Sequence, residues 1–299
     1  LDERPEIFFR DADGDPARHP TWGSFSVDWA SPAYQVMMAD LARHNLERYV
    51  IDGYRVDAAS FKGANWDPNL PYPAYRSGAA AVAVIAAMVD AMRVTKPEAV
   101  MLNEVFGPLF GPFLGSVCDL VHDNMTMGPQ LFLELMAEGR ASAVDYKRHM
   151  ANVFDAQPAA PATGQPIGVS TGEPVGLATG RVFFARNHDT SWFYHFNGYT
   201  PRFMALDAVH ALFAIPEVFA GDPKHGPNPD DDPRIFDTYR RLFALRRRFP
   251  EFSRGRVLLR EVVCDNPMVF SGARRLNDRT TLVVISLSER AEEVTVEVD

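Results

Sequence analysis

Three carboxylates of this sequence stand at or just beyond the ends of short apolar runs. Asp57 lies near the end of residues 54–58, Glu104 lies in "AVMLNEV", and Asp189 follows "RVFFARNH". Arg55 precedes Asp57 by two residues, so the period of two in a β-strand places both side chains on one face. A buried arginine and aspartate are tolerated only where they pair or lie at a site. Carboxylates at such a site can transfer protons or attack as nucleophiles.

The apolar runs alternate with stretches of helical periodicity, which indicates parallel β/α units. Strands are expected at residues 54–58, 99–105, 181–189 and 215–222. Helices are expected at residues 31–49, 79–94, 130–138, 142–154, 201–214 and 233–249. The first of these helices has Ser31 as its expected N-cap and Pro32 in its first turn. In a parallel β/α barrel the carboxyl ends of the strands face the active site, so the three carboxylates would converge there. Any one of them taken alone could instead be a loop-facing acid that caps the next helix.

The pattern changes after about residue 255. The runs "RVLLREVV", "PMVFSGA", "TTLVVISLS" and "EEVTVEVD" are short, rich in β-branched residues and separated by turns. We therefore expect a barrel portion at residues 1–254 and a small antiparallel β domain, which could be incomplete, at 255–299.

Composition excludes several classes of function. The formal net charge is −9 and the sequence pI is about 5.4, which argues against a nucleic-acid or membrane-surface partner. Cys118 and Cys264 have no metal-type spacing, and no apolar run has transmembrane length. No metal spacing links the histidines either, so these are assigned to structural or surface positions: His122, His149, His195 and His210.

Several short motifs resemble those of the α-amylase family of glycoside hydrolases (family 13). "GYRVDAA", "LNEVFG" and "ARNHDTSW" are similar to the second, third and fourth signature regions of that family. "SVDWASP" resembles its auxiliary region ahead of barrel strand 4, and "IPEVFAGD" resembles the stretch at strand 8. The resemblance runs from about residue 22 to the end, and it implies part of a (β/α)8 barrel, about strands 4 to 8, followed by the β domain.

The resemblance also implies roles for individual residues. Asp57 would be the nucleophile that forms a covalent glycosyl intermediate, and Glu104 would act as general acid and then general base. Asp189 would hold sugar hydroxyls and stabilise the distorted transition state, while His188 would contact the sugar in the same subsite. Arg55 would orient Asp57, favour its charged form and offset the unfavourable burial of that charge. The implied partner is an α-glucan oligosaccharide or polysaccharide.

The sequence departs from the family pattern in two places. Nothing in residues 1–21 matches the family's first signature region, and strands 1 to 3 are unaccounted for, so we expect the carboxyl-terminal part of a longer enzyme that is inactive by itself. Ser60 and Phe61 stand where many α-amylases have a Lys-His pair used in calcium and sugar binding. No cofactor is expected to be required. Calcium could bind the full-length protein, but no residue here is identified as a ligand.

Retaining hydrolysis of α-glucosidic bonds is the leading interpretation of these observations. A transglycosylase of the same family is an alternative, because the same intermediate can pass to a sugar hydroxyl. A non-catalytic relative that serves as a binding module is another, although it has no chemical need for all three carboxylates. The sequence leaves the location in the cell open.

Overall fold

The structure of the 299-residue chain is a computed structural model that describes residues 4–11, 13–18, 23–59, 74–105, 114–115, 117–123, 129–155, 181–184, 199–217 and 233–298. The chain forms two compact units, Leu1–His122 and Asp123–Asp299, and each is described by itself. In the described part of the chain, no helix has the length and apolar character needed to cross a membrane. The predicted division into residues 1–254 and 255–299 stays a prediction.

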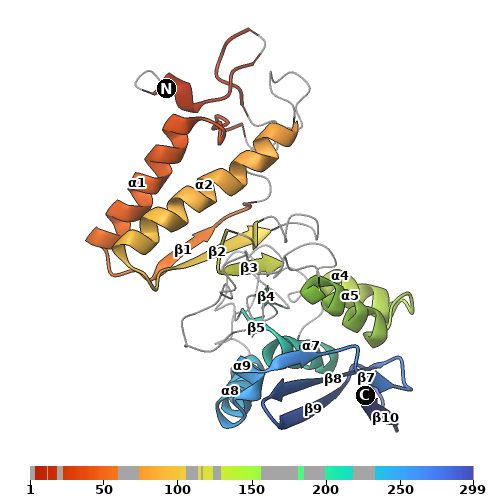
Figure 1. The fold of residues 1–299 in the computed structure, drawn as a ribbon. Coiled ribbons are helices and arrows are strands. Elements are labelled where there is room, and N and C mark those ends of the chain that lie inside the picture. The colour runs from red at the N-terminus through yellow and green to blue at the C-terminus, as the bar shows by residue number, and fades with distance from the viewer. Residues whose placement is uncertain are drawn as a thin grey trace. The chain divides into compact units, whose positions relative to one another are not determined.

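The first unit begins with a short 3-10 helix and then alternates helices with parallel strands (Figure 1). Its elements are η1 (Pro5–Ile7), α1 (Pro32–Arg48), β1 (Gly53–Val56), α2 (Ala74–Thr95) and β2 (Val100–Val105). Strand β3 (Leu120–Asp123) lies where the first unit ends. Helix α1 starts as predicted, because Pro32 is its first residue and the Ser31 hydroxyl accepts a hydrogen bond from the Tyr34 amide at 3.4 Å.

The second unit continues with helices and short strands and ends in antiparallel strands. Its helices are α4 (Pro129–Ala137), α5 (Ala143–Asp155), α7 (Pro201–Phe213), α8 (Pro233–Arg248) and α9 (Glu251–Arg254). Its strands are β4 (Arg181–Phe183), β5 (Ile215–Pro216), β6 (Arg256–Leu258), β7 (Val262–Cys264), β8 (Val269–Leu276), β9 (Arg279–Ser286) and β10 (Val296–Val298).

The strands confirm the predicted fold class, α/β with a parallel sheet followed by small antiparallel sheets. In hydrogen-bonding order the strands of the first unit run β1, β2, β3, and β4 pairs with β5 in the second unit; both the β1–β2 and β4–β5 pairs are parallel. Strand β3 was not predicted, because "LVHD" has only two apolar residues and lacks the length of the other runs. At the carboxyl end, β6–β8–β9 and β7–β10 are antiparallel, and "RVLLREVV" forms two strands instead of one.

One face of the β1–β2 pair packs on helices α1 and α2, which run alongside each other in Figure 1. Met101 and Val105 of β2 belong to the buried core that α2 supplies with Val84, Ile85 and Met88. Because side chains alternate along a strand, the intervening Glu104 of β2 is directed to the opposite face. The helices thus cover one face of the pair and leave the other for polar side chains.

Gly53 allows β1 to begin next to β2. It pairs with Val100 in the parallel register and has a φ of +157°, and a Cβ atom there would lie 1.8 Å from the Val100 carbonyl oxygen. Only a residue without a Cβ atom fits this approach of two backbones. The register that follows pairs Arg55 with Leu102 and Val56 with Asn103.

Two arginines of the second unit, Arg274 buried and Arg246 half-buried, hold the carboxyl end of α7, which leads directly into β5. Arg274 of β8 donates to the Phe213 carbonyl at 2.8 Å and to the Glu251 carbonyl at 3.0 Å. Arg246 of α8 donates to the Ala214 carbonyl at 2.9 Å. Burial, with the charge of Arg246 nearby, lowers the pKa of Arg274 to about 9. The bonds to Phe213 and Ala214 satisfy carbonyls at the end of α7 that lack a partner within the helix, and Arg274 joins the carboxyl-terminal sheet to α7.

We predict that Gly53→Ala lowers the free energy of unfolding by more than ~2 kcal/mol, because the added Cβ atom meets the backbone of β2. Gly14→Ala is the matched control, since Gly14 has a φ of +86° but no atom within 4 Å of an added Cβ. It should lose only about 1 kcal/mol, from backbone strain alone. Urea unfolding of both variants measures the difference, and equal losses would contradict the close approach of β1 and β2.

We predict a second effect on stability from His210 of α7. Its side chain is fully buried, its Nε2 lies 2.6 Å from the Tyr146 hydroxyl, and burial lowers its pKa to about 3 from an ordinary value of 6.5. Between pH 6.5 and about pH 3, His210 is protonated in the unfolded chain but neutral in the folded chain. The free energy of unfolding therefore falls by up to ~1.4 kcal/mol for each unit by which the pH decreases in this range.

His210→Gln keeps an acceptor for the Tyr146 hydroxyl but cannot take up this proton. The free energy of unfolding, measured in urea at pH 7, 6 and 5, should therefore fall less steeply with decreasing pH in the variant than in the wild type. Equal pH dependence of the free energy of unfolding in the two proteins would show that His210 takes up its proton at the same pH in the folded and the unfolded chain.

Candidate active site

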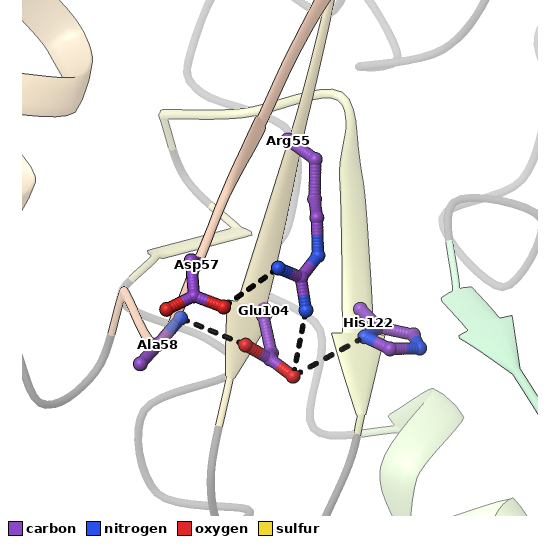
Figure 2. A network of polar contacts seen from close by, with 5 residues as sticks. All are labelled: Arg55, Asp57, Ala58, Glu104 and His122. Carbon is purple, nitrogen blue, oxygen red and sulfur yellow. Dashed lines mark hydrogen bonds and ion pairs between the residues drawn. The ribbon is translucent and has the colours of Figure 1, made fainter. Parts of the chain in front are cut away.

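Arg55 lies between two carboxylates at the carboxyl ends of adjacent parallel strands (Figure 2). Its Nη1 is 2.7 Å from Asp57 Oδ1, and its Nη2 is 2.8 Å from Glu104 Oε1. The strand register explains why the two carboxylates lie close together. Val56 pairs with Asn103, so the next residues along the two parallel strands, Asp57 and Glu104, lie beside each other. A planar guanidinium can donate to two carboxylates at once, which a lysine ammonium does with less directional control.

Glu104 is the buried member of this group, with 1% of its side chain exposed. Its Oε2 accepts a hydrogen bond from the Ala58 amide at 2.8 Å, and its backbone carbonyl accepts one from the Ala59 amide at 2.9 Å. The side chain is therefore held by Arg55 on one oxygen and by the turn after β1 on the other. A buried carboxylate requires such partners, because its loss of hydration is otherwise uncompensated.

Asp57 differs from the sequence prediction in its burial. Its side chain is 64% exposed and that of Arg55 is 33% exposed, since β1 ends at Val56 and Asp57 already belongs to the following turn. The burial that Arg55 offsets is therefore that of Glu104, and the expectation that Asp57 is the buried carboxylate was wrong. One exposed and one buried carboxylate can take different roles, the first open to a reacting atom and the second suited to proton transfer.

Ala58 has an unusual backbone conformation at this turn. Its φ is +46°, in the left-handed region that residues with a Cβ atom rarely adopt, and the residue is buried. This conformation aims its amide at Glu104 Oε2. Strained backbone of this kind recurs where function demands one geometry, so the turn is consistent with a site.

His122 is a residue of this site that the sequence analysis missed. It lies in β3, only 2% of its side chain is exposed, and its Nδ1 is 4.0 Å from Glu104 Oε1 (Figure 2). It had been assigned to a structural or surface position because no metal spacing links it to the other histidines, and the strand that carries it was not predicted. A polar residue at the end of the short run "LVHD", like those that end the runs at Asp57 and Glu104, was the signal that could have identified it.

Asp189 and His188 lie outside the described residues, so their predicted place beside Asp57 and Glu104 stays a prediction. In the part of the chain that the structure describes, no group of three or more His, Cys, Asp and Glu side chains is arranged to hold a metal ion. The arrangement of Arg55, Asp57, Glu104 and His122 supports chemistry that needs one accessible carboxylate and one enclosed carboxyl group.

Comparison of the sequence with protein-family models and with curated proteins gives no match. Solved structures do match. The cyclic α-maltosyl-(1→6)-maltose hydrolase from Arthrobacter globiformis, in complex with cyclic α-maltosyl-(1→6)-maltose, matches with a TM-score of 0.67 and 16% identity over 94% of this chain and 60% of its own.

Two further enzymes match to a similar extent. The debranching enzyme from Nostoc punctiforme has a TM-score of 0.62 and 18% identity over 94% of this chain and 58% of its own. An Anoxybacillus α-amylase has a TM-score of 0.62 and 16% identity over 97% of this chain and 61% of its own. At these identities the likeness establishes the fold alone, and at that level it confirms the predicted resemblance to the α-amylase family. The chain spans about 60% of the length of these structures.

We predict that Arg55→Leu lowers the free energy of unfolding by roughly 2–3 kcal/mol, because it leaves the buried Glu104 carboxyl group without the guanidinium that donates to it. Adding Glu104→Gln should recover part of this loss. Arg43→Leu is the control, since Arg43 forms an exposed pair with Asp40 at 2.8 Å that should contribute less than ~1 kcal/mol. Urea unfolding measures all four proteins. A loss that Glu104→Gln does not reduce would contradict the contact.

Proposed function

We propose that this chain carries the nucleophile and the proton donor of a retaining glycoside hydrolase of the α-amylase type. The observation that carries the proposal is the single guanidinium of Arg55, which contacts both Asp57 and Glu104. Retaining glycosidases need two carboxyl groups about 5–5.5 Å apart, whereas inverting enzymes need about 6.5–9.5 Å. One guanidinium that binds both carboxylates favours the shorter separation.

In the first step Asp57 attacks the anomeric carbon of the sugar. Its exposed carboxylate can reach this carbon, and Arg55 holds it in one orientation. As the bond to the departing oxygen breaks, Glu104 donates its proton to that oxygen. The products are an ester between Asp57 and the sugar, a leaving group with a free hydroxyl and a Glu104 carboxylate.

In the second step water replaces Asp57 at the anomeric carbon. The Glu104 carboxylate takes a proton from the water as it attacks, and the ester bond to Asp57 breaks. Both carboxyl groups return to their starting states, and two inversions leave the product with the configuration of the substrate. Arg55 and the Ala58 amide are placed to stabilise the Glu104 carboxylate between the steps.

The proposed substrate is an α-glucan or maltooligosaccharide. Support comes from the matching folds, which include an Arthrobacter hydrolase bound to a cyclic maltosyl-maltose and a Geobacillus thermoleovorans α-amylase complexed with acarbose. Asp189 is proposed to hold sugar hydroxyls in the transition state, and His188 to contact the same sugar. Since the chain spans about 60% of the matching structures, the activity is proposed for the full-length protein.

We predict that Asp57→Asn in the full-length protein lowers turnover of maltooligosaccharides about 1000-fold or more, a loss of at least ~4 kcal/mol in transition-state stabilisation, because an amide is a poor nucleophile. The control is Asp40→Asn, an exposed aspartate of α1, which should leave turnover unchanged. Proton NMR of fresh wild-type product should show the α-anomer first.

Three outcomes would change the proposal. Retention of more than about a tenth of the activity by Asp57→Asn, under ~1.4 kcal/mol, would remove Asp57 as nucleophile. A β-anomer that appears first would indicate an inverting enzyme. Oligosaccharides longer than the substrate would identify a sugar hydroxyl, not water, as the acceptor in the second step.

A further inference from the structure

His122 reaches Glu104 from the strand on the far side of β2. The contacts from Arg55 and Ala58 come from β1 and its turn, whereas His122 belongs to β3, the other neighbour of β2 in the sheet order. Its Nδ1 is 4.0 Å from Glu104 Oε1, the oxygen that Arg55 also contacts (Figure 2). The Glu104 carboxyl is thus enclosed by polar groups from both neighbouring strands.

Burial strengthens the electrostatic interaction between His122 and Glu104. Both side chains are almost completely enclosed, with 2% of His122 and 1% of Glu104 exposed, so water screens their interaction weakly. The other described charged groups around them are Arg55 and Asp57, which belong to β1 and its turn. The separation of 4.0 Å exceeds an ordinary hydrogen bond of about 2.7–3.2 Å, so the proposed bond requires the two side chains to approach each other as the charge on Glu104 develops.

We propose that His122 is a positioning residue for Glu104. Its Nδ1–H donates to Oε1 of the carboxylate that remains after Glu104 has given its proton to the departing oxygen. The proton moves only from Glu104 to that oxygen, and His122 keeps its own. Because the Glu104 carboxylate is buried, a second donor to Oε1, supplied by the other neighbouring strand, lowers the free energy of the state in which the carboxyl group is ionised.

The catalytic part of this inference rests on the proposed function, and it has a specific consequence. Departure of a sugar hydroxyl needs a proton from Glu104, whereas fluoride departs with little protonation. Loss of His122 should therefore slow the hydrolysis of a maltooligosaccharide much more than that of α-maltosyl fluoride. A residue that serves only the packing of β3 would slow both substrates alike.

The test compares His122→Leu, which removes the donor, with His122→Asn, whose amide supplies an N–H near the position of Nδ1. In the full-length protein His122→Leu should lower kcat for maltooligosaccharides about tenfold or more at unchanged KM, and should change hydrolysis of α-maltosyl fluoride less than about threefold. His122→Asn should recover most of kcat. His44→Leu, an exposed histidine of α1, is the control and should match the wild type.

The pH dependence of kcat/KM is a second, independent measurement on the same variants. Removal of a donor that stabilises the ionised form of Glu104 should move the basic limb of kcat/KM to higher pH in His122→Leu, and His122→Asn should move it back. A shift to lower pH would mean that Nδ1 accepts a proton from Glu104, which overturns the proposed direction of donation. The inference would be overturned if His122→Leu lost kcat equally on both substrates, or if His122→Asn were as slow as His122→Leu. Either result would show that His122 serves only the packing of β3.

Failure of the proposed function is distinguishable from failure of this inference. If the wild type hydrolyses neither substrate, the proposed function fails, and the contact is tested by unfolding the wild type, His122→Leu, Glu104→Gln and the double variant in urea. Effects that do not add would uphold the interaction between the two side chains, and additive effects would overturn it. If His122→Leu does not fold, His122→Ala removes the donor in its place, in both the kinetic and the unfolding measurements.

Discussion

The burial of one carboxyl group, Glu104, is the constraint on which the rest of the site depends. With 1% of its side chain exposed, it requires compensating donors, and these come from Arg55, from the Ala58 amide and, in our proposal, from His122. Arg55 and Ala58 belong to β1 and the turn after it, Glu104 to β2 and His122 to β3, so these three strands must keep their mutual register. Asp57 shares Arg55 with Glu104 but remains exposed, which separates the environments of the two carboxylates.

The fold meets this constraint with several local features. Gly53 permits β1 to approach β2, and the parallel register then places Arg55 one step before the paired strand ends. The turn after β1 adopts a left-handed conformation at Ala58, and this directs two successive amides at Glu104, one to its side chain and one to its carbonyl. Helices α1 and α2 cover the opposite face of the pair and provide the core that holds both strands in place.

Sequence patterns predicted the parts of this site that follow from local periodicity. The two-residue spacing of Arg55 and Asp57 and the run ending near Glu104 indicated a shared strand-end position. The contact of Arg55 with Glu104 as well as with Asp57 was not predicted and comes from the structure. Strand β3 was not predicted, because a four-residue strand can be specified by its neighbours instead of by its own apolar pattern. His122 lies in this strand, so its place in the site was not predicted either. The exposure of Asp57 and the strained turn at Ala58 depend on where β1 ends, which is the least predictable property of an element.

The most direct test of this account is covalent trapping of the nucleophile in the full-length protein. A 5-fluoro-α-glucosyl fluoride should esterify the nucleophile faster than water releases the sugar, and mass spectrometry of the digested protein would locate the label. The account predicts one added fluoroglucosyl group on the peptide that contains Asp57, and no label in Asp57→Asn. A label on another carboxylate, or turnover of the reagent without any covalent adduct, would contradict it.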